Sequence, residues 1–213
     1  MAAPTFSVFV GSETGLLKGI NVDKDYWRNL NEIETPDKSN EIRSLSWNDD
    51  DQTNICVGLR DKRVGSFDVS KQCFTSITSY DGGPGTLKDV FQIDDRTVTA
   101  IDSGVVNVWQ DNEILNTINT IPKQKGSLTC MVHSQYEDNV IATGGKEPEL
   151  KLWDLNDTEK PTFTAKNVKN NWLNLEVPVW VTGVGFLSDK KIVTSTGILD
   201  CPYPLKFIIL IVV

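Results

Sequence analysis

Short segments of alternating apolar and polar residues recur along the chain, separated by clusters of glycine, asparagine and aspartate. Alternation with a period of two predicts strands with one buried face, and the intervening clusters predict tight turns. In four places a small or acidic turn residue stands six positions before a bulky residue that closes such a segment. The pairs are Thr14 and Ile20, Asp61 and Phe67, Ser103 and Trp109, and Glu147 and Trp153. By subtraction of their numbers, the bulky residues are 42 to 47 positions apart, which indicates an internal repeat.

Each complete repeat predicts four strands in succession, and no segment shows a convincing amphipathic helix. The predicted strands are residues 42–47, 54–58, 63–69 and 73–80 in the second repeat, 87–93, 97–101, 105–109 and 114–120 in the third, and 128–133, 139–143, 149–155 and 162–165 in the fourth. A four-stranded unit repeated every forty-odd residues is typical of the blades of a WD40-type β-propeller. We therefore expect an all-β fold of that type.

Both ends of the chain depart from the repeat. The residues before Thr5 leave no room for an innermost strand of the first blade. A fifth blade begins with residues 184–187 and 191–195, but Pro202 and Pro204 fall where its third strand is expected. Proline cannot donate a ladder hydrogen bond, so no third strand is predicted there.

These irregular ends predict an incomplete propeller of about four and a half blades over residues 1–197. The expected blades are residues 5–35, 41–80, 87–120, 127–175 and, in part, 181–197. Residues 198–213 are expected to be a divergent tail that ends in an uncharged apolar run, residues 207–213. Such a run is a hazard for edge pairing, so we expect it to seek a partner.

Composition and charge narrow the classes of protein. The 213 residues carry 29 acidic and 21 basic side chains, a net charge of −8, which argues against independent nucleic-acid binding. Four scattered cysteines without a CxxC motif indicate reduced core thiols of an intracellular protein. The first residues lack the pattern of a signal peptide, and the apolar C-terminal run is far shorter than the roughly twenty residues of a membrane span, so no membrane contact is expected.

Little in the sequence indicates catalysis. The only histidine, His133, lies in a strand predicted to be core, with no nucleophile motif beside it. The stretch from Gly82 to Gly85 lacks the Lys-Ser/Thr continuation of a phosphate loop, and Asp49 to Asp51 lacks the calcium-loop pattern. We expect no enzyme, cofactor or metal site.

The turns of the repeat are the first candidates for binding. Thr14, Asp61, Ser103 and Glu147 fit a structural role, because short polar side chains commonly hydrogen-bond the turn that carries them. Their neighbours would project from the rim of a rigid scaffold, where loops commonly contact partners. The candidate partner contacts there are Ser12, Glu13, Arg60, Lys62 and Lys146.

A second candidate is the connection from residue 166 to residue 172. It combines cationic, amide and indole side chains: Lys166, Asn167, Lys169, Asn170 and Trp172. Such groups suit a docking surface that meets phosphate or acidic groups and anchors an indole. The alternative is a solvated loop in which Trp172 folds against an outer strand, and both interpretations remain open. Trp180 is expected in the core.

Several segments resemble one particular propeller family. They are Val8–Asn21, Asp102–Trp109, Ala142–Leu155 and, most distinctively, Ala165–Trp180. Together they resemble the WD repeat-containing protein 74 family from about Phe6 to Gly197. After Gly197 the sequence departs from that family, so the chain is expected to represent a truncated form.

The resemblance implies a seven-bladed propeller that acts as a non-catalytic scaffold in large ribosomal subunit biogenesis and pre-rRNA processing. The implied partners are pre-ribosomal large-subunit particles, an AAA-type ATPase that removes the protein from them, and the nuclear RNA-exosome machinery. The implied location is the nucleus and nucleolus. The alternative is a generic WD40 interaction adaptor in another complex, although such an adaptor has no reason to carry residues 166–180.

Overall fold

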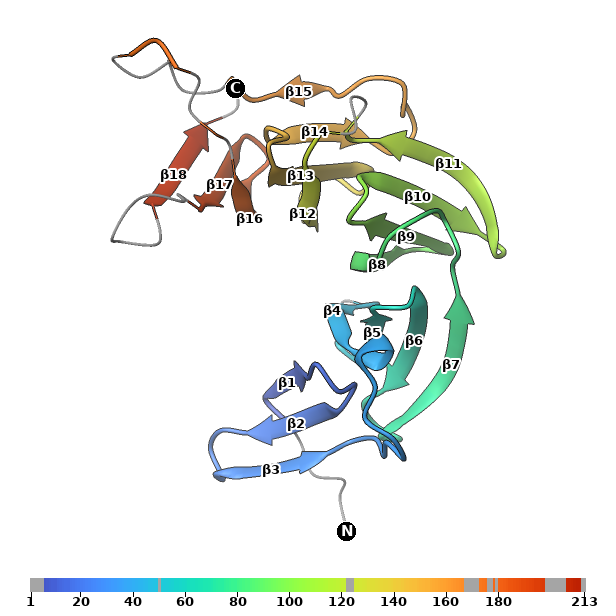
Figure 1. Ribbon diagram of the computed structural model, residues 1–213. Helices are drawn as coiled ribbons and strands as arrows, with labels where there is room; N and C mark the ends of the chain where they lie inside the picture. The colour runs from blue at the N-terminus through green and yellow to red at the C-terminus, as the bar shows by residue number, and fades with distance from the viewer. Residues whose placement is uncertain are drawn as a thin grey trace. The chain divides into compact units, whose positions relative to one another are not determined.

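The computed structural model describes residues 6–49, 51–121, 125–166, 173–175, 178 and 180–197, and the backbone of one further strand, Lys206–Ile211. The fold is all-β, as predicted: its strands form five antiparallel sheets in chain order, each with the meander of a propeller blade (Figure 1). A single turn of 3-10 helix, Lys38–Asn40, interrupts the strands. Among the described residues, no helix is long and apolar enough to cross a membrane.

The strands follow the predicted repeat closely. The first sheet contains β1 (Val8–Gly11), β2 (Leu17–Asn21) and β3 (Tyr26–Asn29). The second contains β4 (Ile42–Trp47), β5 (Asn54–Leu59), β6 (Arg63–Asp68) and β7 (Cys73–Ser79). The third contains β8 (Leu87–Ile93), β9 (Arg96–Ile101), β10 (Val105–Gln110) and β11 (Glu113–Asn119). The fourth contains β12 (Ser127–His133), β13 (Val140–Lys146), β14 (Lys151–Asp154) and β15 (Phe163–Thr164).

The outer part of the fourth sheet is shorter than predicted. Strand β14 begins at Lys151 rather than residue 149, because Pro148 and the left-handed backbone of Glu147 (φ 80°) lengthen the turn before it. Strand β15 spans two residues, but the pairing continues on both sides of it: Thr162 N donates to Leu152 O (2.9 Å) and Ala165 N donates to Leu150 O (2.9 Å).

The fifth sheet corrects one expectation. It contains β16 (Val181–Ser188), β17 (Lys191–Thr196) and β18 (Lys206–Ile211), in that order across the sheet. The sequence predicted no third strand here, yet β18 pairs with β17 from Lys191 opposite Ile211 to Thr196 opposite Lys206. The prolines precede β18 in sequence, so they remove no donor from it, and its β-branched apolar residues favour a strand.

The chain divides into two compact units, residues 1–99 with 109–113 and residues 100–108 with 114–213. In the first unit, neighbouring sheets bury apolar side chains between them. One cluster joins the first and second sheets: Leu17, Leu30, Ile55, Val57 and Phe67. In the second unit, Ala142, Leu150 and Ile192 form a buried cluster from the fourth and fifth sheets. The core therefore lies between successive sheets rather than at one centre.

A buried pair of side chains ten residues apart recurs in successive repeats. In the fourth sheet, Trp153 Nε1 donates to Thr143 Oγ1 (2.9 Å), and Trp109 Nε1 donates to Thr99 Oγ1 (2.8 Å) in the third. A buried indole N–H needs such a partner. The second sheet has Val57 and Phe67 at the equivalent positions, both fully buried, and this pair has no polar group to satisfy.

A carboxylate links the innermost strands of the second and third sheets. Ser44 Oγ on β4 donates to Asp89 Oδ1 on β8, and Ser46 Oγ donates to Val90 O (3.0 Å). Burial raises the pKa of Asp89 to about 6, although the hydrogen bonds from Ser44 and from Val90 N oppose that shift. Asp89 therefore holds its proton at a pH where an exposed aspartate has lost it.

The first prediction tests the recurring pair. Thr143→Val should lower the free energy of unfolding by about 1–3 kcal/mol, because it leaves the Trp153 indole N–H unsatisfied. The double variant Thr143→Val/Trp153→Phe reproduces the apolar pair of the second sheet. Its decrease in unfolding free energy should therefore be smaller than the sum of the decreases in the single variants Thr143→Val and Trp153→Phe. Urea unfolding measures all three, with Thr164→Val, an exposed position on the same sheet, as the near-neutral control. Additive losses would contradict the account.

The second prediction concerns pH. Between about pH 4 and pH 6 the folded state retains a proton on Asp89 that the unfolded chain releases, so the unfolding free energy falls as pH rises through this interval. Asp89→Asn keeps an acceptor for Ser44 and removes this loss. The variant should match wild type near pH 4 and exceed it by about 1–2 kcal/mol near pH 7.5. Urea unfolding across this range measures the difference, and the exposed Asp94→Asn serves as control; an equal difference at every pH would exclude Asp89 as its source.

Candidate interaction rim

In the first three repeats, the turn that precedes the strand of the bulky residue is hydrogen-bonded through its backbone to the first strand of the next sheet. We call residues 12–16, 60–62, 102–104 and 147–150 the rim turns. In the first unit, Ile42 N donates to Ser12 O (3.1 Å), and Leu87 N donates to Arg60 O (3.1 Å). In the second unit, Leu128 N donates to Asp102 O (3.0 Å). These main-chain bonds fix the backbone from which the rim side chains project.

The first rim turn is closed by its own hydroxyl groups. Ser12 Oγ accepts from Leu16 N (2.8 Å) and lies 3.0 Å from Thr14 Oγ1. Gly15 has a left-handed backbone (φ 90°), and a Cβ there would lie 2.7 Å from Asn40 O. Glu13 at the tip is exposed. Thr14 thus lies within a local hydrogen-bond network, whereas Glu13 presents a solvated carboxylate.

The second rim turn contains the acidic residue of the repeat. Asp61 accepts from Arg63 N (3.2 Å) and, through its other oxygen, from Arg63 Nε (2.6 Å). Arg63 also donates from Nη2 to Asn40 Oδ1 (2.6 Å). The carboxylate therefore bonds the backbone of its own turn, and the arginine it holds reaches the connection that precedes the second sheet.

The two cations predicted as partner contacts in this turn are both paired. Arg60 Nη1 lies 2.9 Å from Glu41 Oε2, which also contacts Arg43 Nη2 at 3.1 Å. Lys62 Nζ pairs with Asp81 and donates to Gly83 O (2.9 Å), and its side chain is only 19% exposed. The charges of Arg60 and Lys62 are therefore largely neutralised within the protein, which sequence spacing did not indicate. Their contact with a partner stays a prediction.

In the second unit the rim turns present different groups. Ser103 is exposed at a turn whose Gly104 has a left-handed backbone (φ 91°) and accepts from Thr120 N (2.9 Å). Lys146 is exposed, and its Nζ lies 5.8 Å from the centre of the Trp180 ring. Glu147 pairs with Lys125 at 3.2 Å.

The connection predicted as a docking surface is described only at its start. Lys166 is exposed, whereas Asn167, Lys169, Asn170 and Trp172 lie outside the described residues. Trp180, predicted to be core, is half-buried: it pairs with Lys146 through an isolated bridge, and a Cβ at Gly197 would lie 2.6 Å from its ring.

The side chains that could serve in catalysis or metal binding are buried or hydrogen-bonded within the protein. His133 is half-buried, and its Nε2 lies 2.9 Å from Asp138 O. Burial raises the pKa of the Cys56 thiol to about 12, so it is not a nucleophile near neutral pH. Asp49 accepts from Thr53 N (2.7 Å) and closes its own loop. Within the described residues, no group of three potential ligands is placed to hold a metal ion.

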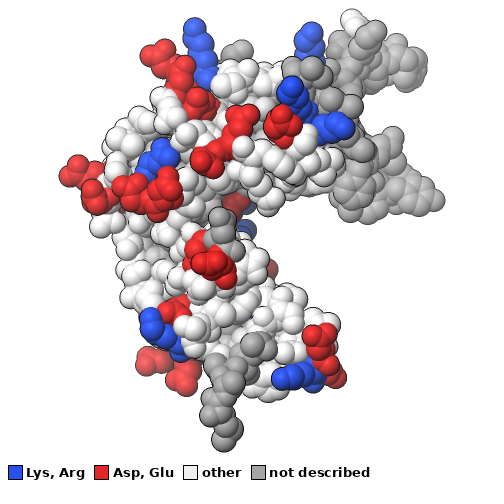
Figure 2. All heavy atoms as spheres, turned by 180° about the vertical axis from the view of Figure 1, so that it is seen from behind, with Lys and Arg blue, Asp and Glu red and all other residues white. Residues whose placement is uncertain are grey.

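The charged surface agrees with the acidic composition. Figure 2 shows groups of acidic side chains with basic side chains between them, and no continuous basic area on the face that it draws.

Comparison with known proteins identifies relatives of the chain. No family model matches it. Over 193 residues, 89% of this chain and 50% of the relative, it is 37% identical to WD repeat-containing protein 74 of Mus musculus. The Homo sapiens protein of the same name is 36% identical over the same shares. The "Ribosome biogenesis protein nsa1" of Schizosaccharomyces pombe is 25% identical over 85% of this chain and 53% of its own length.

Solved structures agree on the fold. The crystal structure of the RRP9 WD40 repeats superposes with a TM-score of 0.69 at 16% identity, covering 88% of this chain and 55% of that one. At this identity the likeness shows the WD40 propeller fold alone. Together with the sequence relatives it confirms the predicted resemblance: the chain is a WD40-repeat relative of the WD repeat-containing protein 74 family and spans about half the length of those proteins.

Proposed function

We propose that the chain is a non-catalytic WD40 scaffold in large ribosomal subunit biogenesis and pre-rRNA processing, and that it docks on pre-ribosomal particles. The supporting structural observation is the rim, in which the first three turns are bonded through their backbone to the first strand of the next sheet. Contact side chains on such a scaffold lose little conformational freedom on binding. The names of the relatives, among them fungal ribosome biogenesis proteins, support the choice of process.

The proposed contacts fall into two classes. Glu13, Lys146 and Lys166 are exposed and can meet a partner directly. Arg60 and Lys62 would contribute only if the partner shares or displaces the carboxylates of Glu41 and Asp81. Displacement of an existing ion pair adds a desolvation cost, so we assign these two a secondary part. Ser12 and the loop residues Asn167, Lys169, Asn170 and Trp172 complete the proposed surface.

The finer parts of the proposal follow from the family resemblance. An AAA-type ATPase would release the protein from the particle, the nuclear RNA-exosome machinery would be a further partner, and the site of action would be the nucleus and nucleolus. The net charge of −8 supports recruitment through protein contacts rather than through independent binding to RNA.

The third prediction tests the docking loop. Replacement of Lys166, Lys169 and Trp172 by alanine should reduce co-sedimentation of the tagged chain with large-subunit precursor particles by about tenfold, because an anchoring indole and two cations are removed together. The matched control replaces Lys24, Lys160 and Trp27, which are exposed and lie outside the rim. Sucrose-gradient fractions of nuclear extract, probed for the tag, give the measurement. Equal loss in both variants, or no loss in either, would remove the loop from the docking surface.

The fourth prediction concerns turnover. The purified chain should hydrolyse no ATP above background, since its buried thiol and its half-buried histidine are not placed as a nucleophile and base. ATP-dependent release from particles should require a separately added ATPase. A malachite-green phosphate assay measures this; turnover that survives purification and disappears on a point substitution in the chain would contradict the proposal.

A further inference from the structure

A pocket of about 370 Å³ lies within the first unit, between the first and second sheets and beside the first rim turn. Its wall comes from the connection between β3 and β4, which covers residues 30–41, and its floor from the second sheet. None of the partner contacts proposed above lines it. Pockets of a few hundred Å³ with an apolar floor and few polar groups are the usual form of a binding site.

The floor is apolar and partly open to solvent. Val57 is fully buried beneath it, while Ile77 on β7 is 55% exposed. Phe74 also lines the pocket, with its ring edge-on to Phe67 at a centroid distance of 5.3 Å. It occupies the space left by Gly65, where a Cβ would lie 2.8 Å from the Phe74 ring. Phe74 and Ile77 therefore form an apolar floor on which a bulky apolar side chain would cover exposed apolar surface.

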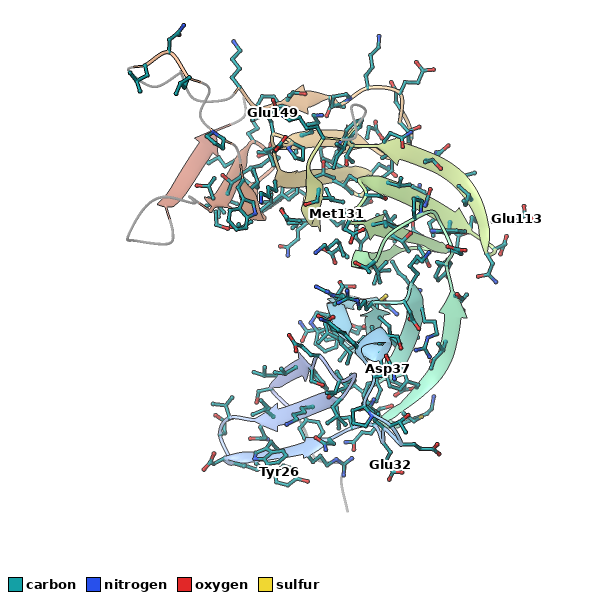
Figure 3. All side chains as sticks on the ribbon, in the orientation of Figure 1. Tyr26, Glu32, Asp37, Glu113, Met131 and Glu149 are labelled. Atoms are coloured by element: carbon teal, nitrogen blue, oxygen red, sulfur yellow. The ribbon has the colours of Figure 1, made fainter. Side chains whose placement is uncertain are left out.

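The lip of the pocket is acidic. Glu32 and Glu34 line it from the connection between β3 and β4, where Figure 3 labels Glu32. Both are exposed, and neither has a hydrogen bond or ion pair within the described part of the chain. Among the described residues that line the pocket, the one cation is Arg63, and it is held by Asp61 and Asn40. The field at the entrance is therefore negative, which opposes an anionic ligand and favours a cationic one.

We infer that this pocket binds an extended basic peptide segment of a partner protein, with one bulky apolar side chain inserted and flanking lysine or arginine residues at Glu32 and Glu34. The volume of about 370 Å³ leaves room for one anchor side chain of leucine, methionine or phenylalanine size together with part of the peptide around it. A second copy of the chain is disfavoured as the occupant because each copy carries a net charge of −8. The pocket lies apart from the rim contacts, and a basic peptide would bind there whether or not the chain acts in ribosome biogenesis.

The test uses the whole chain and a fluorescent peptide with one phenylalanine flanked by pairs of lysines. Fluorescence anisotropy should show saturable binding that weakens as salt is raised. A peptide with alanine in place of phenylalanine should bind about tenfold more weakly, and one with glutamates in place of the lysines should not bind. The first comparison isolates the anchor and the second isolates the charge.

Two variants locate the binding. Glu32→Gln/Glu34→Gln should weaken the phenylalanine peptide about tenfold and reduce its salt dependence, while the control Glu113→Gln/Glu137→Gln, at exposed sites elsewhere, should leave both unchanged. Ile77→Ala, at a side chain exposed enough to be replaced without unfolding, should reduce the preference for phenylalanine over alanine. The inference is overturned if the alanine peptide binds equally well, if the control pair matches the lip pair, or if Ile77→Ala instead converts a dimer to a monomer on size exclusion.

Discussion

Each sheet buries apolar side chains against a neighbouring sheet, and these shared clusters hold the strands in place. The residue ten positions before each repeat's bulky anchor shows it: Val57, Thr99 and Thr143 are at most 1% exposed. Val10, which occupies that position in the first sheet, is 42% exposed. Among the described residues, the buried clusters combine side chains from two neighbouring sheets, so each repeat depends on a neighbour for its stability.

This arrangement also explains why the rim is a suitable place for contacts. Face-to-face packing fixes the strands, and backbone hydrogen bonds from the first three rim turns to the next sheet hold those turns in place. Side chains at the tips of these turns do not pack in the core. Some of them form local ion pairs, as Lys62 does with Asp81, whereas Glu13 and Lys146 are exposed to solvent. The packing of the first sheet on the second also leaves the pocket above Val57. The rim turns and this pocket therefore both result from the packing of neighbouring sheets.

Much of this fold could be predicted from the sequence because the period of two and the repeat of forty-odd residues are local signals. Strand Ile42–Trp47 and strand Leu87–Ile93 were predicted to the residue. Strand Lys206–Ile211 was missed, since the prolines before it look like a broken strand when pairing partners are unknown. The contact of Arg60 with Glu41 and the acidic pocket were missed for different reasons: the contact depends on the pairing of β4 with β5, which places these two residues opposite each other, and the pocket depends on the packing of two sheets. The sequence indicates which charged side chains lie at the turns, but only the folded structure shows which of them are paired with another side chain of the protein.

Affinity purification of the tagged chain under mild salt, followed by sequencing of the associated RNA, tests whether the chain acts on the large ribosomal subunit. Protein-mediated docking predicts enrichment of large-subunit precursor rRNA over small-subunit precursor rRNA, and loss of that RNA after wash conditions that strip proteins from the particle. Equal recovery of both precursors, or recovery of neither alongside a stable protein complex of another kind, would contradict the claim and favour a general WD40 adaptor.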